Sequence, residues 1–225
     1  MSSTNRAAKA QSDTNRSDTN RSDTNREDIL RAAIEEFGRV GYESASTNEI
    51  VKKAKVSKGL LFHHFNNKEK LYIACQLHVM EQYGKYMSEH INLASTDFFD
   101  RILHNLRVKM DFGRNHPEFL TLINRTWHME SETNAFDRKW LEEYVLDSEV
   151  GKIMLEFFSG VDTTCFREGY DVPKLLNFTR LALEASWHRF SNIHNNDSQI
   201  LTREMDSYIS ECEEIISLLR DGAYK

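Results

Sequence analysis

Basic and small residues gather in one short part of the sequence, between residues 46 and 68. Ser57, which can begin a helix, is followed directly by Lys58 and Gly59, and two histidines and another lysine come soon after. A lysine ammonium can donate to guanine O6 and N7, and a glycine lets the backbone approach a phosphate or base edge closely. Residues 51–70 contain six lysines and only one acidic residue. These residues could therefore bind the phosphates and base edges of a nucleic acid.

The excess of positive charge is local to this part of the chain. The whole sequence has 29 Lys and Arg against 35 Asp and Glu, a net charge of −6. Residues 26–72 carry nine basic and seven acidic side chains, whereas residues 73–225 carry 16 and 25. A basic segment on an acidic body fits an electrostatic footprint on phosphate. A solvated, lysine-rich helix face would look the same, so charge alone leaves both interpretations open.

Two short helices joined by a brief turn are predicted between residues 46 and 65. Ser46, with Glu49 three residues later, forms a capping box that begins the first helix. Ser57 begins the second helix, directly after a turn at Lys55 and Val56. The inward-facing apolar positions are Ile50, Val51, Ala54, Leu61 and Phe65. This spacing predicts a helix-turn-helix, a unit that places the start of its second helix against base edges in the DNA major groove.

The same stretch resembles the tetracycline-repressor (TetR) family over about residues 26 to 75. The family pattern is a Thr- or Ser-capped helix with Ile-Ala, then Ala-Gly-Val-Ser, Gly-x-Leu-Tyr-x-His-Phe and Lys-Glu-x-Leu. The matching segments here are Ser46, Ile50-Val51, Ala54-Lys55-Val56-Ser57, Gly59-Leu60-Leu61-Phe62-His63-His64-Phe65, Lys68-Glu69-Lys70-Leu71 and, upstream, Phe37-Gly38-Arg39-Val40-Gly41-Tyr42. The many fixed spacings make this a specific resemblance.

The helix-turn-helix and this resemblance together predict the DNA-contacting residues. They are Ser46, Thr47, Ser57, Lys58, Gly59, Leu60, Phe62, His63, His64 and Lys68. Lys68 lies in the first turn of the next helix, where a positive charge is unfavourable for the helix dipole. A bound phosphate explains a lysine there better than helix stability does.

Two positions depart from the family pattern. Lys55 stands where the family has a glycine, so a residue with a side chain must fit the turn. Phe62 stands where the family has a tyrosine, so the hydroxyl-to-phosphate hydrogen bond is missing there. The neighbouring His63 is the candidate to replace that contact. These departures bear on binding strength and operator choice.

The chain as a whole is predicted to be all-α, with an N-terminal three-helix DNA-binding domain and a C-terminal helical bundle. Proline and glycine are sparse, at two and nine residues, and no period-two alternation indicates a strand. The first helix is expected to begin at the Thr24–Glu27 capping box and to end at Gly38 or Gly41. Further helices are predicted at about 68–93, 97–113, 116–129, 135–159, 172–194 and 198–220.

Three parts of the chain are distinguished. Residues 1–23 contain a tandem Ser-Asp-Thr-Asn-Arg repeat almost without apolar residues, so we expect a disordered tail. Its arginines could reach a DNA groove, or the tail could be an inert extension. Residues 24–70 are predicted to form the helix-turn-helix domain. Residues 71–225 are predicted to bind a ligand and to dimerise.

The resemblance implies a homodimer that binds a palindromic operator, with the last two helices pairing as a four-helix bundle. The predicted helices at about 172–194 and 198–220 agree, because apolar residues surround most of the first and form one stripe along the second. An internal core without a dimer would also use such residues. The family's usual mode implies repression.

The resemblance further implies a small-molecule effector, here expected to be apolar or aromatic, inside the C-terminal domain. Its candidate contacts are His104, Arg107, Met110, Phe119, Ile123, Trp127, His128 and Tyr144. Core packing explains each apolar member equally well, and surface ion pairing explains each polar one. The expected mechanism is that the effector shifts the C-terminal helices, that helix 68–93 carries the shift to the DNA-binding heads, and that their separation then no longer matches the operator.

Other classes of protein fit the sequence less well. Motifs of hydrolases, zinc proteases and phosphate-binding loops are missing, so we expect no enzyme, cofactor or metal site. Cys75, Cys165 and Cys212 are few and widely spaced, which suits packing in a reducing cytoplasm. No apolar run is long enough for a membrane span. A helical protein-interaction adaptor remains an alternative, although it does not explain Lys58, His64 and Lys68 lying on one presumed face.

Overall fold

The computed structural model shows an all-helical chain. It describes residues 3–127, 151–152, 156–157 and 159–224. Within these residues the one pairing of extended backbone is an isolated antiparallel bridge between Phe166 and Tyr224. The predicted fold class is therefore confirmed. None of the described helices is long and apolar enough to cross a membrane.

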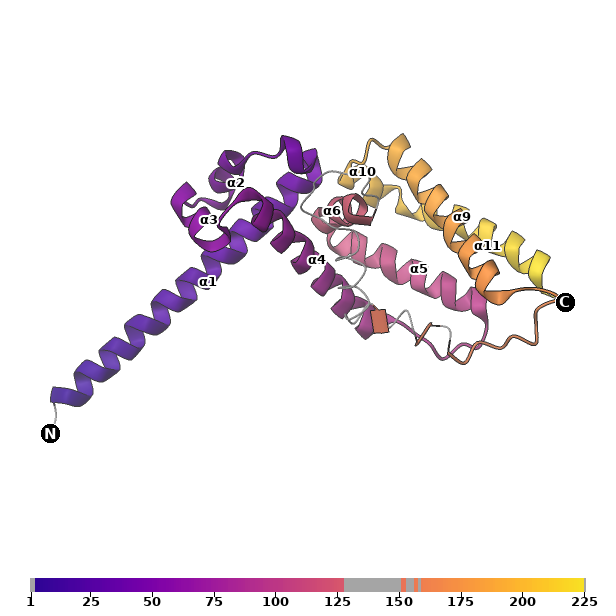
Figure 1. The fold of residues 1–225 in the computed structure, drawn as a ribbon, viewed down its shortest axis with the longest axis horizontal. Helices are drawn as coiled ribbons and strands as arrows, with labels where there is room; N and C mark the ends of the chain where they lie inside the picture. Colours follow the sequence, from indigo (N-terminus) through magenta and orange to yellow (C-terminus); the bar gives the residue numbers. More distant parts are fainter. Residues whose placement is uncertain (1–2, 128–150, 153–155, 158, 225) are drawn as a thin grey trace.

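The helices form a small N-terminal group followed by a larger C-terminal group (Figure 1). Their bounds are α1 Ser3–Ser44, α2 Thr47–Ala54, α3 Lys58–Phe65, α4 Lys68–His90, α5 Phe98–Asn115, α6 Pro117–Trp127, α9 Val172–Ile193, α10 Ser198–Arg203 and α11 Met205–Ala223. α4 runs from the N-terminal group into the C-terminal one, where α5 lies between α4 and the pair α9 and α11 (Figure 1).

Helix α1 departs from the prediction at both ends. It begins at Ser3 and projects away from the other helices, so Thr24 lies inside it and residues 3–23 are helical rather than a disordered tail (Figure 1). No proline or glycine interrupts this stretch, and each repeat places an aspartate three residues before an arginine, a favourable helical spacing. At the other end, Gly38 remains helical, and the kink is at Gly41, whose φ is 78°.

The other helix bounds mostly match the sequence pattern. Pro117 and Pro173 lie in the first turns of α6 and α9, where a missing N–H costs little. The last predicted helix is divided into α10 and α11 at Glu204, which capping patterns did not reveal. Most of the helix predicted at 135–159 lies outside the described residues.

Three apolar clusters hold the described helices together. The first cluster joins the four helices α1, α2, α3 and α4 to parts of α5 and α6. It includes Phe37, Leu61 and Tyr72. The second lies between α5, α6 and the C-terminal helices, around Trp187. The third gathers at the end of the molecule that contains Phe98 and the C-terminus. Because the first cluster contains residues from both sides of residue 70, the two predicted domains share one continuous core.

The contact between α1 and α6 depends on a glycine. A Cβ at Gly38 would overlap Thr121 Oγ1 and would lie 3.4 Å from Thr121 Cβ. Only a residue without a side chain lets the two helices approach this closely. Gly38 therefore fixes the position of the N-terminal group directly against α6.

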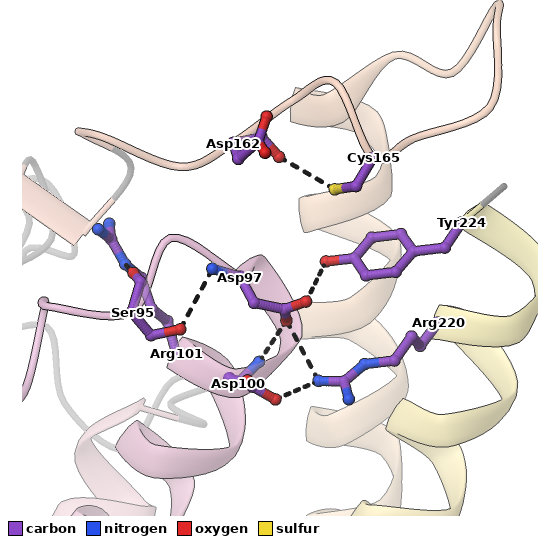
Figure 2. A network of polar contacts seen from close by, with 8 residues as sticks. All are labelled: Ser95, Asp97, Asp100, Arg101, Asp162, Cys165, Arg220 and Tyr224. Atoms are coloured by element: carbon purple, nitrogen blue, oxygen red, sulfur yellow. Dashed lines mark hydrogen bonds and ion pairs between the residues drawn. The ribbon is translucent and has the colours of Figure 1, made fainter.

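Polar contacts anchor the linker between α4 and α5 to the C-terminal end of the chain (Figure 2). Asp97 caps α5 and also accepts hydrogen bonds from Tyr224 Oη at 2.9 Å and Arg220 Nη2 at 3.2 Å. Arg220 pairs with Asp100 as well. The start of α5 is thereby bound to the end of α11.

Arg101 anchors the same linker from within. Its side chain is 4% exposed and its guanidinium donates to the carbonyl oxygens of Leu93, Phe157 and Ser159, each at 2.7 Å, and to that of Ser95. Four carbonyl acceptors offset the cost of burying the charge. These hydrogen bonds therefore hold the linker after α4 in a fixed position.

We predict that Gly38→Ala lowers the free energy of unfolding by up to about 2 kcal/mol, because the cost of overpacking, about 1–3 kcal/mol, outweighs the gain of about 1 kcal/mol in helix propensity. Urea denaturation measures it. Adding Thr121→Ala should recover most of the loss, since it removes Thr121 Oγ1. Gly222→Ala, where a Cβ meets nothing within 4 Å, is the matched control. Equal effects at the two glycines would contradict the assignment.

Candidate nucleic-acid interface

The start of α2 is fixed by two oxygen acceptors. Ser46 Oγ accepts from the Glu49 backbone N–H at 3.5 Å, which is the predicted cap. The reciprocal contact differs from a capping box, because the Ser46 N–H donates to Glu36 Oε1 of α1 at 3.2 Å. Glu36 is 8% exposed and also pairs with Arg39 at 2.6 Å. A buried carboxylate on α1 therefore orients α2.

The turn between α2 and α3 requires a left-handed residue. Lys55 has φ 56° and ψ 37°, and its N–H bonds back to the Lys52 carbonyl oxygen at 3.3 Å. This is the position where the sequence predicted that a non-glycine must fit. Left-handed backbone costs a residue with a Cβ about 1 kcal/mol, so the turn is formed against a local preference.

Helix α3 presents its first turn to solvent. Ser57 caps it, with Oγ accepting from the Leu60 N–H at 3.2 Å, and Ser57, Lys58 and Gly59 are all exposed. A Cβ at Gly59 would meet only Ser57 Oγ, at 3.9 Å, so the space in front of this turn is open. Lys58 Nζ donates to Asn48 Oδ1 at 3.0 Å. That contact holds the ammonium of α3 against the first turn of α2.

The remaining predicted contacts lie on either side of this turn. His63 is exposed near the end of α3, and its ring centroid lies 5.5 Å from that of His64. The half-buried members of the predicted set are Ser46, Thr47, Leu60, Phe62, His64 and Lys68. Phe62 packs partly against the first cluster, so it serves the core as well as the surface.

Lys68 has partners that the sequence did not reveal. Its ammonium donates to the Glu43 carbonyl oxygen at 3.1 Å and lies 4.8 Å from the centroid of the Tyr42 ring. Burial, with Glu69 and Glu43 nearby, raises the pKa of Tyr42, so the ring stays neutral beside the cation. Asn67 Oδ1 caps α4 by accepting from the Lys70 N–H at 2.8 Å. Lys68 thus joins the first turn of α4 to the end of α1.

Sequence reasoning missed three supporting residues. Glu36 and Asn48 hold the start of α2 and Lys58, and Arg26 of α1 lies 5.4 Å from the centroid of the Phe65 ring at the end of α3. Only Asn48 carried a local signal, since it directly follows the predicted contacts Ser46 and Thr47. The other two depend on tertiary packing.

The predicted effector residues are not gathered around one cavity within the described part of the chain. Met110 belongs to the second cluster, whereas Phe119 and Ile123 belong to the first. His128 and Tyr144 lie outside the described residues, as does the side chain of Trp127. A surface depression of about 660 Å³ lies between Thr163 and Pro173 and contains none of the predicted residues.

The two polar candidates of α5 have partners within the protein. His104 Nε2 donates to the His90 carbonyl oxygen at 3.1 Å, at the end of α4. Arg107 pairs with Glu213 of α11 at 2.6 Å. These contacts give both side chains structural roles.

Two of the three cysteines are packing residues. Cys75 and Cys212 are buried, and burial raises the pKa of both thiols, that of Cys212 to about 11. A protonated buried thiol is a poor nucleophile. Groups of His, Cys, Asp and Glu that could hold a metal are absent from the described residues.

The arrangement of α2 and α3 on a helical body defines a helix-turn-helix protein. The family described as "Bacterial regulatory proteins, tetR family" matches residues 29–75. The Transposon Tn10 TetC protein of Escherichia coli is 32% identical over 138 residues, which cover 53% of this chain and 68% of that protein. The chain belongs to the TetR family, whose members are transcriptional regulators rather than enzymes.

Other relatives match over part of their length. The HTH-type transcriptional regulator QacR of Staphylococcus aureus is 44% identical over 124 residues, 52% of this chain and 64% of the relative. The HTH-type transcriptional repressor NicS of Pseudomonas putida is 25% identical, and the match spans only 44% of its length. A TetR family regulator from Chloroflexus aurantiacus has the same fold, with a TM-score of 0.65, 16% identity, and coverage of 89% of this chain and 94% of that one.

We predict that Lys55→Gly raises the free energy of unfolding by about 0.5–1 kcal/mol, because glycine adopts the left-handed turn without the cost borne by lysine. Urea denaturation measures the change. Lys52→Gly, at a helical position in the last turn of α2, is the matched control and should lower the same quantity by up to about 1 kcal/mol. A loss of stability in both variants would show that the turn does not strain Lys55.

Proposed function

We propose that this chain is a ligand-responsive repressor that binds a palindromic operator as a homodimer and is released by a small molecule. The observation that carries the proposal is the exposed first turn of α3, with Ser57, Lys58 and Gly59 facing open space on a helix-turn-helix. The chain's membership of a family of transcriptional regulators supports the same conclusion.

In the proposed complex, α3 lies in the major groove. Lys58 donates to guanine, and the open space at Gly59 admits the base edges or a phosphate. Ser46 and Thr47 at the start of α2 contact one strand. The proposed phosphate contacts on the other side are His63 and Lys68, and Leu60, Phe62 and His64 complete the set. Lys68 would bind phosphate while keeping its contact with Tyr42.

The proposed dimer pairs α9 and α11 with the same helices of a second copy. Phe178 and Leu181 of α9 are 53% and 45% exposed, and Leu218 of α11 is 74% exposed. Large apolar side chains exposed on two adjacent helices support an interface. An isologous interface gives two recognition helices related by a two-fold axis, which is the symmetry of a palindrome.

The proposed effector, apolar or aromatic in its body, acts by changing the separation of the two heads. α4 carries the change, as does α6, because Gly38 packs α1 directly against Thr121. The effector can do this only if it binds one head spacing more tightly than the other. In this scheme residues 24–70 bind DNA, residues 71–225 bind effector and dimerise, residues 1–23 form an N-terminal extension, and the protein acts in the cytoplasm.

Selection of duplexes from a random DNA pool tests the proposal, and we expect the full chain to recover a palindrome. Lys58→Ala should relax base preference within each half-site, since a good base contact contributes about 1–3 kcal/mol of discrimination. Lys85→Ala, on an exposed part of α4, is the control. Failure of the wild-type chain to bind any duplex at low salt would refute DNA binding and favour the adaptor alternative.

Leu181→Glu should convert the dimer to monomers, because it places two like charges in an apolar interface. Analytical ultracentrifugation across a concentration series measures the shift. Gln199→Glu on α10 adds the same charge at an exposed position away from the proposed interface and should leave the dimer intact. A dimer that survives Leu181→Glu unchanged would mean that α9 does not form the interface.

A further inference from the structure

The lysine that begins α3 contacts a neutral side chain rather than a carboxylate. Lys58 Nζ donates to Asn48 Oδ1 on α2 at 3.0 Å, and no carboxylate of the described residues lies within ion-pair distance of this ammonium. Lys53 on α2, by contrast, pairs with Glu35 of α1. The position of the Lys58 ammonium is therefore restrained, while its positive charge remains available to a ligand.

Both partners of this contact stand on anchored backbone. Asn48 lies in the first turn of α2, which Ser46 caps. The turn that separates the two helices is closed by a hydrogen bond from the Val56 N–H to the Val51 carbonyl oxygen at 3.0 Å. Because the cap and the turn fix the spacing of α2 and α3, the fold itself brings the two side chains together.

The contact determines which atoms the pair presents to solvent. An ammonium only donates, so the atom of Asn48 that faces Lys58 must be the carbonyl oxygen, and the NH₂ group must face away. Both residues are exposed. The outward-facing atoms of the pair are therefore all N–H donors, two on the ammonium and two on the amide.

Of the four bases, guanine matches such a group of donors best. In the major groove guanine presents two neighbouring acceptors, O6 and N7, whereas adenine presents N7 beside an amino donor, cytosine presents an amino donor, and thymine presents one acceptor beside a methyl group. A donor placed against an amino group has no acceptor, which is costly in an interface that excludes water. A lysine without a partner is a flexible point charge that can turn toward any nearby acceptor, phosphates included.

We propose that Asn48 is a positioning residue that sets the base specificity of Lys58. Its carbonyl oxygen holds one N–H of the ammonium, so that the other two meet O6 and N7 of a single guanine in each half-site of the operator. The geometry thus selects guanine over adenine through a residue of α2 acting on a residue of α3. This inference rests on the proposed binding of a DNA operator and names a specificity-determining residue within it.

Fluorescence anisotropy of the full chain with the operator selected from the random pool tests this, at the base whose preference Lys58→Ala relaxes. We expect guanine at this base. Its replacement by adenine in one half-site should weaken wild-type binding at least about tenfold, the order of one bidentate base contact. Asn48→Ala should reduce that ratio at least about threefold, the size of one hydrogen bond. Asn48→Asp keeps an acceptor for Lys58, so it should retain the ratio while its added charge weakens binding to all sequences alike.

Glu49→Gln is the matched control, since it changes a neighbouring exposed residue of the same turn and should leave the guanine-to-adenine ratio unchanged. Inosine keeps O6 and N7 and should bind as guanine does, whereas 7-deazaguanine lacks N7 and should bind more weakly.

Three results would overturn the role of Asn48 while the proposed function stands. They are an unchanged ratio in Asn48→Ala, a base other than guanine at the position that Lys58 reads, and a Lys58→Ala variant that keeps full preference at every position. Failure of the wild-type chain to bind any duplex counts instead against the proposed function.

Discussion

Helix α3 is held in place by two inward side chains, Leu61 and Phe65. An isolated helix of eight residues is not stable in water, so its position comes from packing rather than from propensity. Both side chains enter the cluster that also contains Phe37 of α1 and Tyr72 of α4. The outward direction of Lys58 and Gly59 is a consequence of this burial, because residues on opposite sides of a short helix cannot turn independently.

The same cluster makes the DNA-binding group continuous with the body. It extends along α4 and reaches Phe112 of α5 and Leu122 of α6. Gly38 adds a second, closer contact through Thr121. A group held by two packed elements cannot pivot on one alone, so any movement of the DNA-binding group requires α4 and α6 to move together.

The sequence predicted those features that depend on a few adjacent residues. Ser46 and Ser57 begin helices because each short side chain caps its own helix, and Lys55 takes the left-handed position that its place in the turn requires. These are local interactions, visible in a window of four residues.

Contacts between distant segments were not predictable in this way. Glu36 replaces Glu49 as the acceptor for the Ser46 N–H because α1 crosses the start of α2, and no local pattern records that crossing. Glycine is typical of a helix end, but at Gly38 the lack of a side chain instead allows close packing against α6. The effector residues were chosen by type and helix, and residue type does not show that a polar group already has a partner within the protein, as Arg107 has.

Contacts along α5 connect the C-terminal helices to the DNA-binding group. The start of α5 is fixed by Asp97 and Arg101, so α5 is anchored at one end. Toward the other end, Phe112 contacts Tyr83 and Tyr86 of α4 and lies 6.1 Å, between ring centroids, from Phe119 of α6. These are the two helices that hold the DNA-binding group in place. A displacement of Phe112 would therefore alter packing shared by α4 and α6, and a close-packed core transmits such a displacement rather than absorbing it locally.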